Sequence, residues 1–175
     1  MVIIKNLLIG TIGLFVVVTL MSLLLPSDIK VSRAVIINAP EDSVYKQIAD
    51  FKNWKNWHPL FKNDSSVITF SNPSFGKNAY CNIIFNGKKS HLVITNSDSS
   101  FVQFLSQEKD AFDIENEISI VPVKEQNNLR IEWKALTKLH WYPWDKFYGI
   151  FIDRITGNGY QQSLESLKDY IEMKR

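Results

Sequence analysis

Residues 112–120 read FDIENEISI, and residues 129–135 read LRIEWKA. In both stretches apolar side chains alternate with charged or polar ones, which is typical of a strand with one buried face. If the two strands pair, their acids and bases mix on the solvent side while the apolar faces meet the core. These segments therefore predict an antiparallel sheet whose apolar face needs a cover.

The same pattern extends over residues 67–137, where strand-like runs are separated by turn residues. Asn86-Gly87 is the clearest hairpin signal, because both residue types tolerate a positive φ. Further turns are predicted at residues 71–73, 96–98 and 126–128. Together with a strand at residues 29–37, the sequence predicts one strand followed by a run of about six.

Two segments have helical spacing. Residues 40–50 start with a proline and two acids, which favour a helix start, and carry apolar residues at 4-then-3 spacing. One apolar stripe at 4, 3, 4 spacing follows near the C-terminus: Tyr160, Leu164, Leu167 and Ile171. Residues 144–155 are either part of this helix or a separate short one, and Gly157 and Gly159 predict a bend or a close backbone approach. A single helix covering a curved sheet leaves room for a cavity.

Residues 7–25 read LLIGTIGLFVVVTLMSLLL, nineteen residues without a charge. At about 1.5 Å per residue this run is roughly 28 Å long, close to the roughly 30 Å hydrocarbon core of a bilayer. We predict a transmembrane anchor over residues 1–27, with Leu7, Phe15 and Leu25 in the bilayer, ahead of a domain over residues 28–175. A cleaved signal peptide is the alternative, although its apolar core ordinarily spans about 7–15 residues.

The charge balance and the spacing of histidine and cysteine argue against nucleic-acid binding and against metal binding. Lys5 is the only charged residue before Asp28, so the rest of the chain carries 19 basic and 18 acidic residues and gives no reason to expect nucleic acid. The three histidines lack companions at metal-ligand spacing, and Cys81 is the only cysteine. We therefore predict no metal site and no cofactor.

Two motifs carry a family resemblance. The first motif is residues 31–59, VSRAVIINAPEDSVYKQIADFKNWKNWHP: a strand, INAP followed by acids, a short helix and W-x-x-W-x-P. The second motif is residues 147–172, FYGIFIDRITGNGYQQSLESLKDYIE: a glycine-containing turn followed by an aromatic residue and Leu-x-x-Leu-Lys. Over roughly residues 29–173 the chain resembles the START-like superfamily, also called SRPBCC or polyketide cyclase/dehydrase-like, in a bacterial membrane-anchored form. The resemblance implies an α+β helix-grip fold, in which a curved antiparallel sheet wraps around a long C-terminal helix and an apolar pocket lies between them. Members mostly bind lipids, sterols, polyketides or other hydrophobic molecules, and some catalyse cyclisation or dehydration.

The residues expected to line the pocket come from the strands and from the terminal helix. They are Tyr80, His91, Gln103, Phe112, Ile114, Asn116, Ile118, Trp133 and Tyr160. Asn116 falls on an apolar face, so its amide needs a partner, which is a ligand group, a bulge or an internal hydrogen bond. The aromatic segment at residues 139–144, LHWYPW, either rims the pocket and touches the lipid surface or packs under the helix start.

These observations predict a single-pass protein of the bacterial inner membrane that binds a hydrophobic small molecule or lipid without catalysis. One alternative is a cyclase or dehydratase in which His91, Tyr80 or Asn116 polarises a bound carbonyl group. The other is a protein-interaction module that binds its partner through the aromatic segment.

Overall fold

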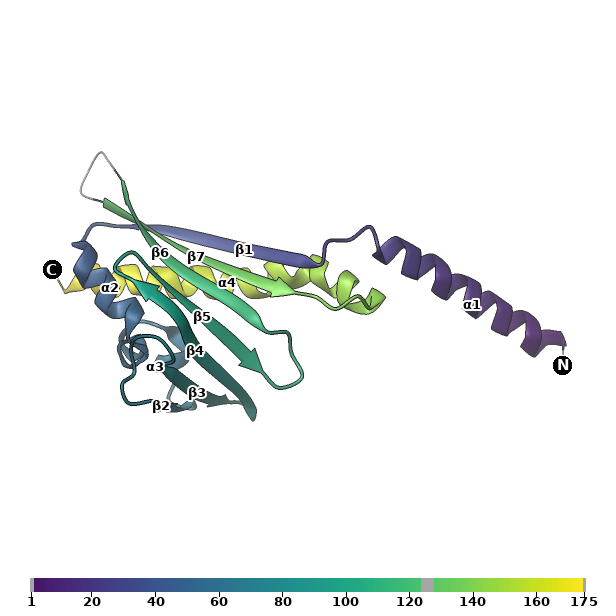
Figure 1. The fold of residues 1–175 in the computed structure, drawn as a ribbon, viewed down its shortest axis with the longest axis horizontal. Helices are drawn as coiled ribbons and strands as arrows, with labels where there is room; N and C mark the ends of the chain where they lie inside the picture. The colour runs from purple at the N-terminus through teal and green to yellow at the C-terminus, as the bar shows by residue number, and fades with distance from the viewer. Residues whose placement is uncertain (1, 124–127, 175) are drawn as a thin grey trace.

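Within the described residues, 2–123 and 128–174, the computed structural model shows an N-terminal helix, a seven-stranded sheet and a long C-terminal helix (Figure 1). The helices are α1 (Val2–Ser22), α2 (Glu41–Ala49), the 3-10 helix η1 (Phe51–Asn56), α3 (Pro59–Lys62) and α4 (Pro143–Met173). The strands are β1 (Asp28–Ile37), β2 (Val67–Phe70), β3 (Tyr80–Phe85), β4 (Lys88–Asp98), β5 (Phe101–Glu108), β6 (Ile114–Val123) and β7 (Asn128–Lys138). The turn predicted at residues 126–128 falls largely outside the described residues.

The sheet is an antiparallel meander with β1 added at one edge. Its strand order is β1-β7-β6-β5-β4-β3-β2, so β2 to β7 follow the chain and β1 pairs with β7. The Asn86-Gly87 hairpin is confirmed: these residues connect β3 to β4 with φ values of 49° and 78°. The curved sheet with α4 across it confirms the predicted α+β helix-grip fold.

The two strands from which the fold was predicted are neighbours. Glu117 lies opposite Lys134 in the β6–β7 register, and Lys138 Nζ lies 2.8 Å from Glu115 Oε1. Acids and bases therefore alternate on the outer face, as expected. Exposed pairs of this kind contribute about 0–1 kcal/mol each, so the sheet depends mainly on its buried inner face.

The W-x-x-W-x-P segment forms a buried corner. Trp54 and Trp57 are fully buried, and their indole nitrogens donate 3.0 Å hydrogen bonds to the carbonyl oxygens of Ile48 and Gln47 in α2. A buried indole N–H needs an acceptor, and the C-terminal end of a helix has free carbonyls. The corner thus fixes η1 and α3 against the end of α2.

The C-terminal helix is continuous from Pro143 to Met173, so residues 144–155 belong to it. Gly157 marks the predicted close approach, because a Cβ atom there would collide with the guanidinium of Arg33 on β1. Gly159 has nothing within 4 Å of the position that a Cβ would take, so no close neighbour requires a glycine at this position. The close backbone approach is therefore found at one of the two glycines.

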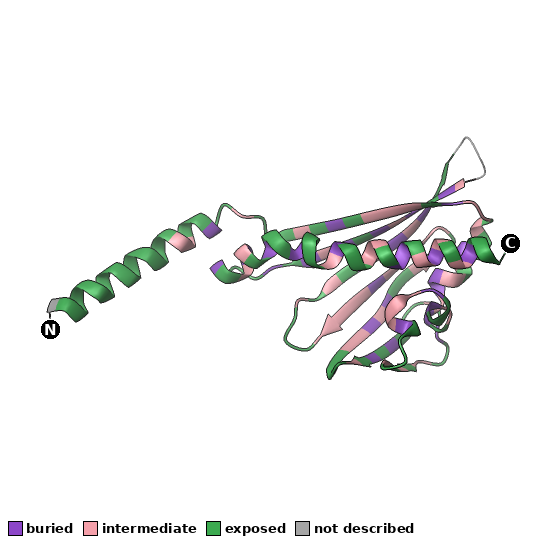
Figure 2. Ribbon diagram, turned by 180° about the vertical axis from the view of Figure 1, so that it is seen from behind, coloured by how far each residue is buried: buried purple, intermediate pink, exposed green. Residues whose placement is uncertain are grey.

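Helix α1 is long and apolar enough to cross a membrane and is exposed along nearly its whole length (Figure 2). It contains Leu7 and Phe15 but ends at Ser22, so Leu25 lies in the turn after the helix. The helix thus ends three residues before the apolar run does. Pro26 prevents the helix from including Leu25, because proline disfavours helical geometry in the residue before it.

Candidate functional site

A cavity of about 240 Å³ lies between the sheet, α4 and the aromatic corner. Aromatic and aliphatic side chains from the corner and the strands form most of its wall: Trp54, Leu60, Phe61, Ile83, Leu92, Phe104 and Trp133. The polar lining residues are His58, Ser90, Ser106, Asn116, Thr156, Tyr160 and Ser163. The lining that the structure describes contains no aspartate or glutamate.

Trp133 is the centre of the aromatic wall. Its ring centroid lies 5.0 Å from that of Tyr160, 5.9 Å from that of Trp54 and 5.9 Å from that of Phe104. Aromatic rings at such spacings pack in tilted or edge-to-face pairs and bury large apolar areas. This side of the wall is consequently apolar and closely packed.

Asn116 supports this wall from within the sheet. Its Oδ1 accepts a 3.0 Å hydrogen bond from Trp133 Nε1, and its Nδ2 donates a 3.0 Å hydrogen bond to the Ile114 carbonyl oxygen. Of the alternatives that the sequence left open, the internal hydrogen bond is the one present. The buried amide thereby orients the Trp133 ring toward the cavity.

Most of the lining residues were not among the candidates from the sequence, and His58 is the titratable one of these. It is the N-cap of α3, where its Nδ1 accepts a 3.2 Å hydrogen bond from the Leu60 backbone N–H, and its ring stacks on Trp54 at 5.3 Å. Because Nδ1 is an acceptor, the ring proton is on Nε2. Burial lowers the pKa of His58 to about 3, so the ring is neutral at pH 7 and presents one N–H donor. The sequence signal that indicates this position is the His58-Pro59 pair, because proline favours the first position of a helix and the residue before it is then the N-cap.

Tyr160 lines the cavity from α4, as its place on the predicted stripe implied. Burial raises the pKa of its hydroxyl to about 12, so the group stays protonated. No residue of the described chain is hydrogen-bonded to the Tyr160 hydroxyl or to His58 Nε2. Both rings contact Trp133, with centroids 5.0 Å and 5.9 Å away, so the two donors border one hollow.

Apart from Ser106, the other polar lining groups are already engaged within their own elements or with a neighbour. Ser163 Oγ and Thr156 Oγ1 each donate a 2.8 Å hydrogen bond to a carbonyl oxygen of α4. Ser90 Oγ lies 3.5 Å from Glu108 Oε2. His58 and Tyr160 are therefore the main groups left to recognise a polar atom in the cavity.

Three of the residues expected to line the pocket lie on the opposite face of the sheet. Strand side chains alternate, so Tyr80, His91 and Gln103 point outward while their neighbours Cys81, Leu92 and Phe104 are buried. His91 Nδ1 is 2.8 Å from Asn82 Oδ1, and Gln103 Nε2 donates a 2.8 Å hydrogen bond to Glu117. The period-2 pattern of β3 to β5 could have excluded them, because their apolar neighbours occupy the inner positions.

The remaining candidates belong to the apolar interior. Ile118 is fully buried in the main core. Phe112 and Ile114 pack against a smaller cluster formed with Val31 and Ile152 at the other end of α4. Only Asn116, Trp133 and Tyr160 of the nine candidates line the cavity, and ligand contact by any of them stays a prediction.

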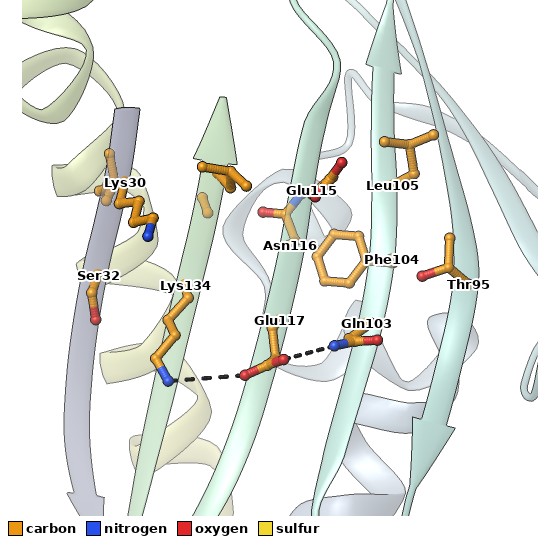
Figure 3. Close-up of a pocket in the computed structure, with 13 residues that line it drawn as sticks. Lys30, Ser32, Thr95, Gln103, Phe104, Leu105, Glu115, Asn116, Glu117 and Lys134 are labelled. Carbon is orange, nitrogen blue, oxygen red and sulfur yellow. Dashed lines mark hydrogen bonds and ion pairs between the residues drawn. The ribbon is translucent and has the colours of Figure 1, made fainter. Parts of the chain in front are cut away.

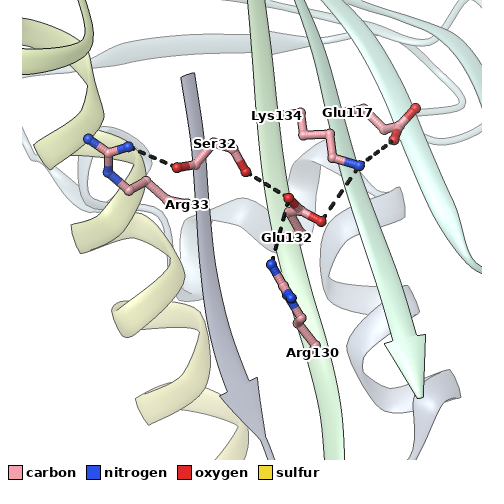
Figure 4. A network of polar contacts seen from close by, with 6 residues as sticks. All are labelled: Ser32, Arg33, Glu117, Arg130, Glu132 and Lys134. Carbon is pink, nitrogen blue, oxygen red and sulfur yellow. Dashed lines mark hydrogen bonds and ion pairs between the residues drawn. The ribbon is translucent and has the colours of Figure 1, made fainter. Parts of the chain in front are cut away.

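A second, larger depression lies on the outer face of the sheet, with a volume of about 710 Å³ (Figure 3). Solvent-facing side chains of β1, β4, β5, β6 and β7 contribute to it, and two of its charged residues pair across the strands: Lys134 Nζ lies 3.9 Å from Glu117 Oε1 and also 3.6 Å from Glu132 Oε2. Glu132 also accepts a 2.7 Å hydrogen bond from Ser32 (Figure 4). This bond, with the nearby cations, keeps the pKa of Glu132 below its usual value. The depression is larger, but it lies on the solvent-facing side of the sheet, and most of its charged groups are in ion pairs.

Comparison with known proteins identifies the fold and the family. Among solved structures, the START superfamily protein from Mycobacterium smegmatis is similar at 16% identity and a TM-score of 0.62, over 84% of this chain and 99% of that chain. CV1439 from Chromobacterium violaceum is similar at 18% identity and a TM-score of 0.57, over 84% of this chain and 99% of that chain.

DynU16, a protein of the dynemicin biosynthetic locus, is similar at 12% identity and a TM-score of 0.61, over 83% of this chain and 48% of that chain. The search of curated proteins gave no match. The family described as polyketide cyclase / dehydrase and lipid transport matches residues 28–172, which is nearly the whole of the chain after α1. The chain therefore belongs to the polyketide cyclase / dehydrase and lipid transport family, and it shares its fold with the START superfamily protein.

Proposed function

We propose that this protein binds an uncharged hydrophobic molecule or lipid in the cavity between the sheet and α4, and that it does so without catalysis while tethered to a membrane. The observation that carries the proposal is an aromatic hollow with two unpaired neutral donors, His58 Nε2 and the Tyr160 hydroxyl. An apolar pocket with a few placed polar groups is the usual form of a small-molecule site. Neutral donors favour a carbonyl, ester or ether oxygen on the ligand.

The size of the cavity restricts the ligand further. Pockets for drug-sized molecules usually measure about 300–1,000 Å³, and this one measures about 240 Å³. The ligand is therefore a compact molecule or one end of a longer lipid. The second option suits a domain whose α1 helix holds it at the bilayer.

Binding without catalysis is supported by the chemistry of the lining. General acid–base catalysis needs a group that accepts a proton near the operating pH. His58 cannot accept one, because its Nδ1 is occupied by the Leu60 N–H and burial keeps its pKa at about 3. A cyclase or dehydratase is the second candidate, since His58 and Tyr160 could polarise a carbonyl, but it requires a base from the substrate or from water.

The tether is α1, which we place across the bacterial inner membrane as a single span. The family match begins at residue 28, directly after the predicted anchor, which supports the division into residues 1–27 and 28–175. A cleaved signal sequence near the N-terminus can also be long and apolar enough to resemble a membrane span. Mass measurement of the membrane-extracted chain separates the two, because only cleavage removes the first residues.

The experiment that tests binding uses the full chain, extracted from its membrane in mild detergent. Solvent extraction followed by mass spectrometry identifies any co-purifying molecule, and titration with a fluorescent apolar dye measures the number of sites. We expect one saturable site and an uncharged extracted species with an acceptor oxygen. Failure of the dye to saturate, together with an extract free of such species, would overturn the proposal.

A further inference from the structure

The end of the domain that adjoins α1 carries an exposed aromatic surface, which we call the collar: Trp141, Tyr142, Trp144 and Tyr148. Trp141 is 68% exposed and Trp144 is 60% exposed. Three of the rings form one group, since the Tyr142 centroid lies 5.0 Å from those of Trp141 and Trp144, and the Tyr142 and Trp144 planes are nearly parallel at 8°; Tyr148 is 46% exposed one turn further along α4. Packing under the helix start does not account for rings that are this exposed, and residues 139–144 do not line the cavity, so of the predicted roles for this segment contact with the lipid surface is the one that remains a prediction.

The collar lies where the chain leaves α1. The Ser27 carbonyl oxygen accepts a 2.8 Å hydrogen bond from the Leu139 backbone N–H, and the Ser27 hydroxyl is bonded to the buried Lys146 ammonium. Ser22, the last residue of α1, is also buried. These contacts attach the link between α1 and β1 to the start of α4, so the base of α1 and the collar occupy the same end of the domain (Figure 1).

The direction of α4 defines which residues are near the bilayer. In Figure 1, α1 and α4 extend in opposite directions from this junction. With α1 across the bilayer, the collar lies at the level of the headgroups and the rest of α4 leads away from it. Ile155 is eleven residues beyond Trp144, roughly 17 Å along the helix, and therefore lies outside the headgroup layer.

The chemistry of the collar suits the headgroup layer. Tryptophan and tyrosine combine an apolar ring with a polar tip and are enriched where membrane and water meet. The acid among them, Asp145, is 2.9 Å from His140 Nδ1 and lies in the first turn of α4, where the helix dipole favours a negative charge. The carboxylate therefore has a hydrogen-bond partner and a favourable helix dipole within the protein.

We propose that the collar is a second membrane contact, seated in the headgroup layer of the bilayer that α1 crosses, and that it holds the domain upright with α4 pointing away. The proposal rests on the anchoring role of α1. The collar contacts lipid, because it adjoins the end of α1, the helix that is long enough to span a membrane. An upright domain keeps the cavity, lined by Thr156 and Tyr160, more than one helical turn beyond the headgroups.

The test uses the full chain in phosphatidylcholine–phosphatidylglycerol vesicles with one environment-sensitive label per variant. Labels are attached in Trp144→Cys, in Ile155→Cys and, within the anchor, in Phe15→Cys. Cys81 stays unlabelled in the folded protein, since it is buried and burial raises the pKa of its thiol to about 12. Lipids with a nitroxide on the headgroup or deep in the acyl chain then report depth by quenching.

We expect the acyl-chain nitroxide to quench the label at position 15 and the headgroup nitroxide to quench the label at position 144, with neither quenching position 155. If position 15 is quenched and position 144 is not, the collar proposal fails while the anchor stands. Equal quenching at 144 and 155 would show a domain lying flat and would overturn the upright arrangement. If the label at position 15 is not quenched, the proposal that α1 anchors the protein in the membrane is wrong.

Two further variants guard against a local effect of the label. Tyr148→Cys places the label one turn further along the collar, and it should be quenched by the headgroup nitroxide if the collar is seated in lipid. Trp141→Glu should weaken that quenching, whereas Gln161→Glu on the polar half of α4 should not. Quenching that is insensitive to Trp141→Glu, or a blue shift that depends on protein concentration instead of lipid, would indicate a protein partner and overturn the proposal.

Discussion

The guanidinium of Arg33 on β1 forms an ion pair with the carboxylate of Asp153 on α4, with Nη2 2.9 Å from Oδ1. The guanidinium also fills the space that a side chain at Gly157 would need. A charged residue on the inner face of an edge strand is thus accommodated by a glycine and an acid one turn apart on the helix. This contact sets how closely α4 approaches β1.

Alanine substitution at the two glycines of α4 should separate packing from helix propensity. Gly159→Ala should stabilise the fold by up to about 1 kcal/mol, because alanine favours the helix and nothing lies near the new methyl group. Gly157→Ala should lose most of that gain, since the Arg33 guanidinium must move and the ion pair with Asp153, worth about 0–1 kcal/mol, is broken. Urea unfolding of both variants in detergent micelles measures the difference. Equal gains at the two sites would contradict the assigned contact.

Removing the tyrosine hydroxyl from the cavity should weaken ligand binding. Tyr160→Phe keeps the ring against Trp133 but deletes one donor, so we expect the Kd for an acceptor-bearing ligand to rise about tenfold, which corresponds to roughly 1.4 kcal/mol. Tyr80→Phe is the matched control, because Tyr80 lies on the outer face of the sheet. Titration of the ligand identified by extraction measures both. A larger effect on the Kd at Tyr80 than at Tyr160 would indicate that the ligand binds on the outer face of the sheet.

The depressed pKa of His58 should make stability depend on pH. Between about pH 6.5 and pH 3 the unfolded chain binds a proton at this residue that the folded chain does not, so stability falls as the pH decreases through that window. The effect is up to about 1.4 kcal/mol per pH unit for one proton. His58→Asn retains a capping acceptor for the Leu60 N–H but does not titrate. The variant should therefore lose less stability than the wild type on acidification, as measured by unfolding at several pH values.

The hydrogen bond between Asn116 and Trp133 should be costly to break from one side. Asn116→Leu leaves the Trp133 indole N–H buried without an acceptor, and we expect a loss of about 1–3 kcal/mol. Combining it with Trp133→Phe removes the stranded donor. The double variant should then be less destabilised than the sum of the two single variants. Additive losses would show that the bond contributes little.

The strands and helices were predicted well because they depend on local patterns. The alternation in residues 112–120 and 129–135, the Asn86-Gly87 hairpin and the stripe from Tyr160 to Ile171 each report which face of one element is buried. The helix-start signal at Pro40 likewise predicted α2. The family motifs then supplied the arrangement of these elements around α4.

The candidate site was predicted less well because it depends on which faces meet. Tyr80, His91 and Gln103 have suitable chemistry, but the pleat turns them to the outer side. His58 lines the cavity because α3 places it beneath Trp133, and no spacing rule links these two residues along the chain.

The sequence by itself determined the apolar N-terminal helix, the antiparallel sheet and the covering helix, since each follows from a periodicity of 3.6 or 2 residues within one segment. Only the tertiary structure decided that the interior leaves a small hollow, that His58 and Tyr160 border it, and that the aromatic collar adjoins the base of α1. These are distances between residues far apart in the chain. They depend on how side chains pack against one another, which a linear pattern does not encode.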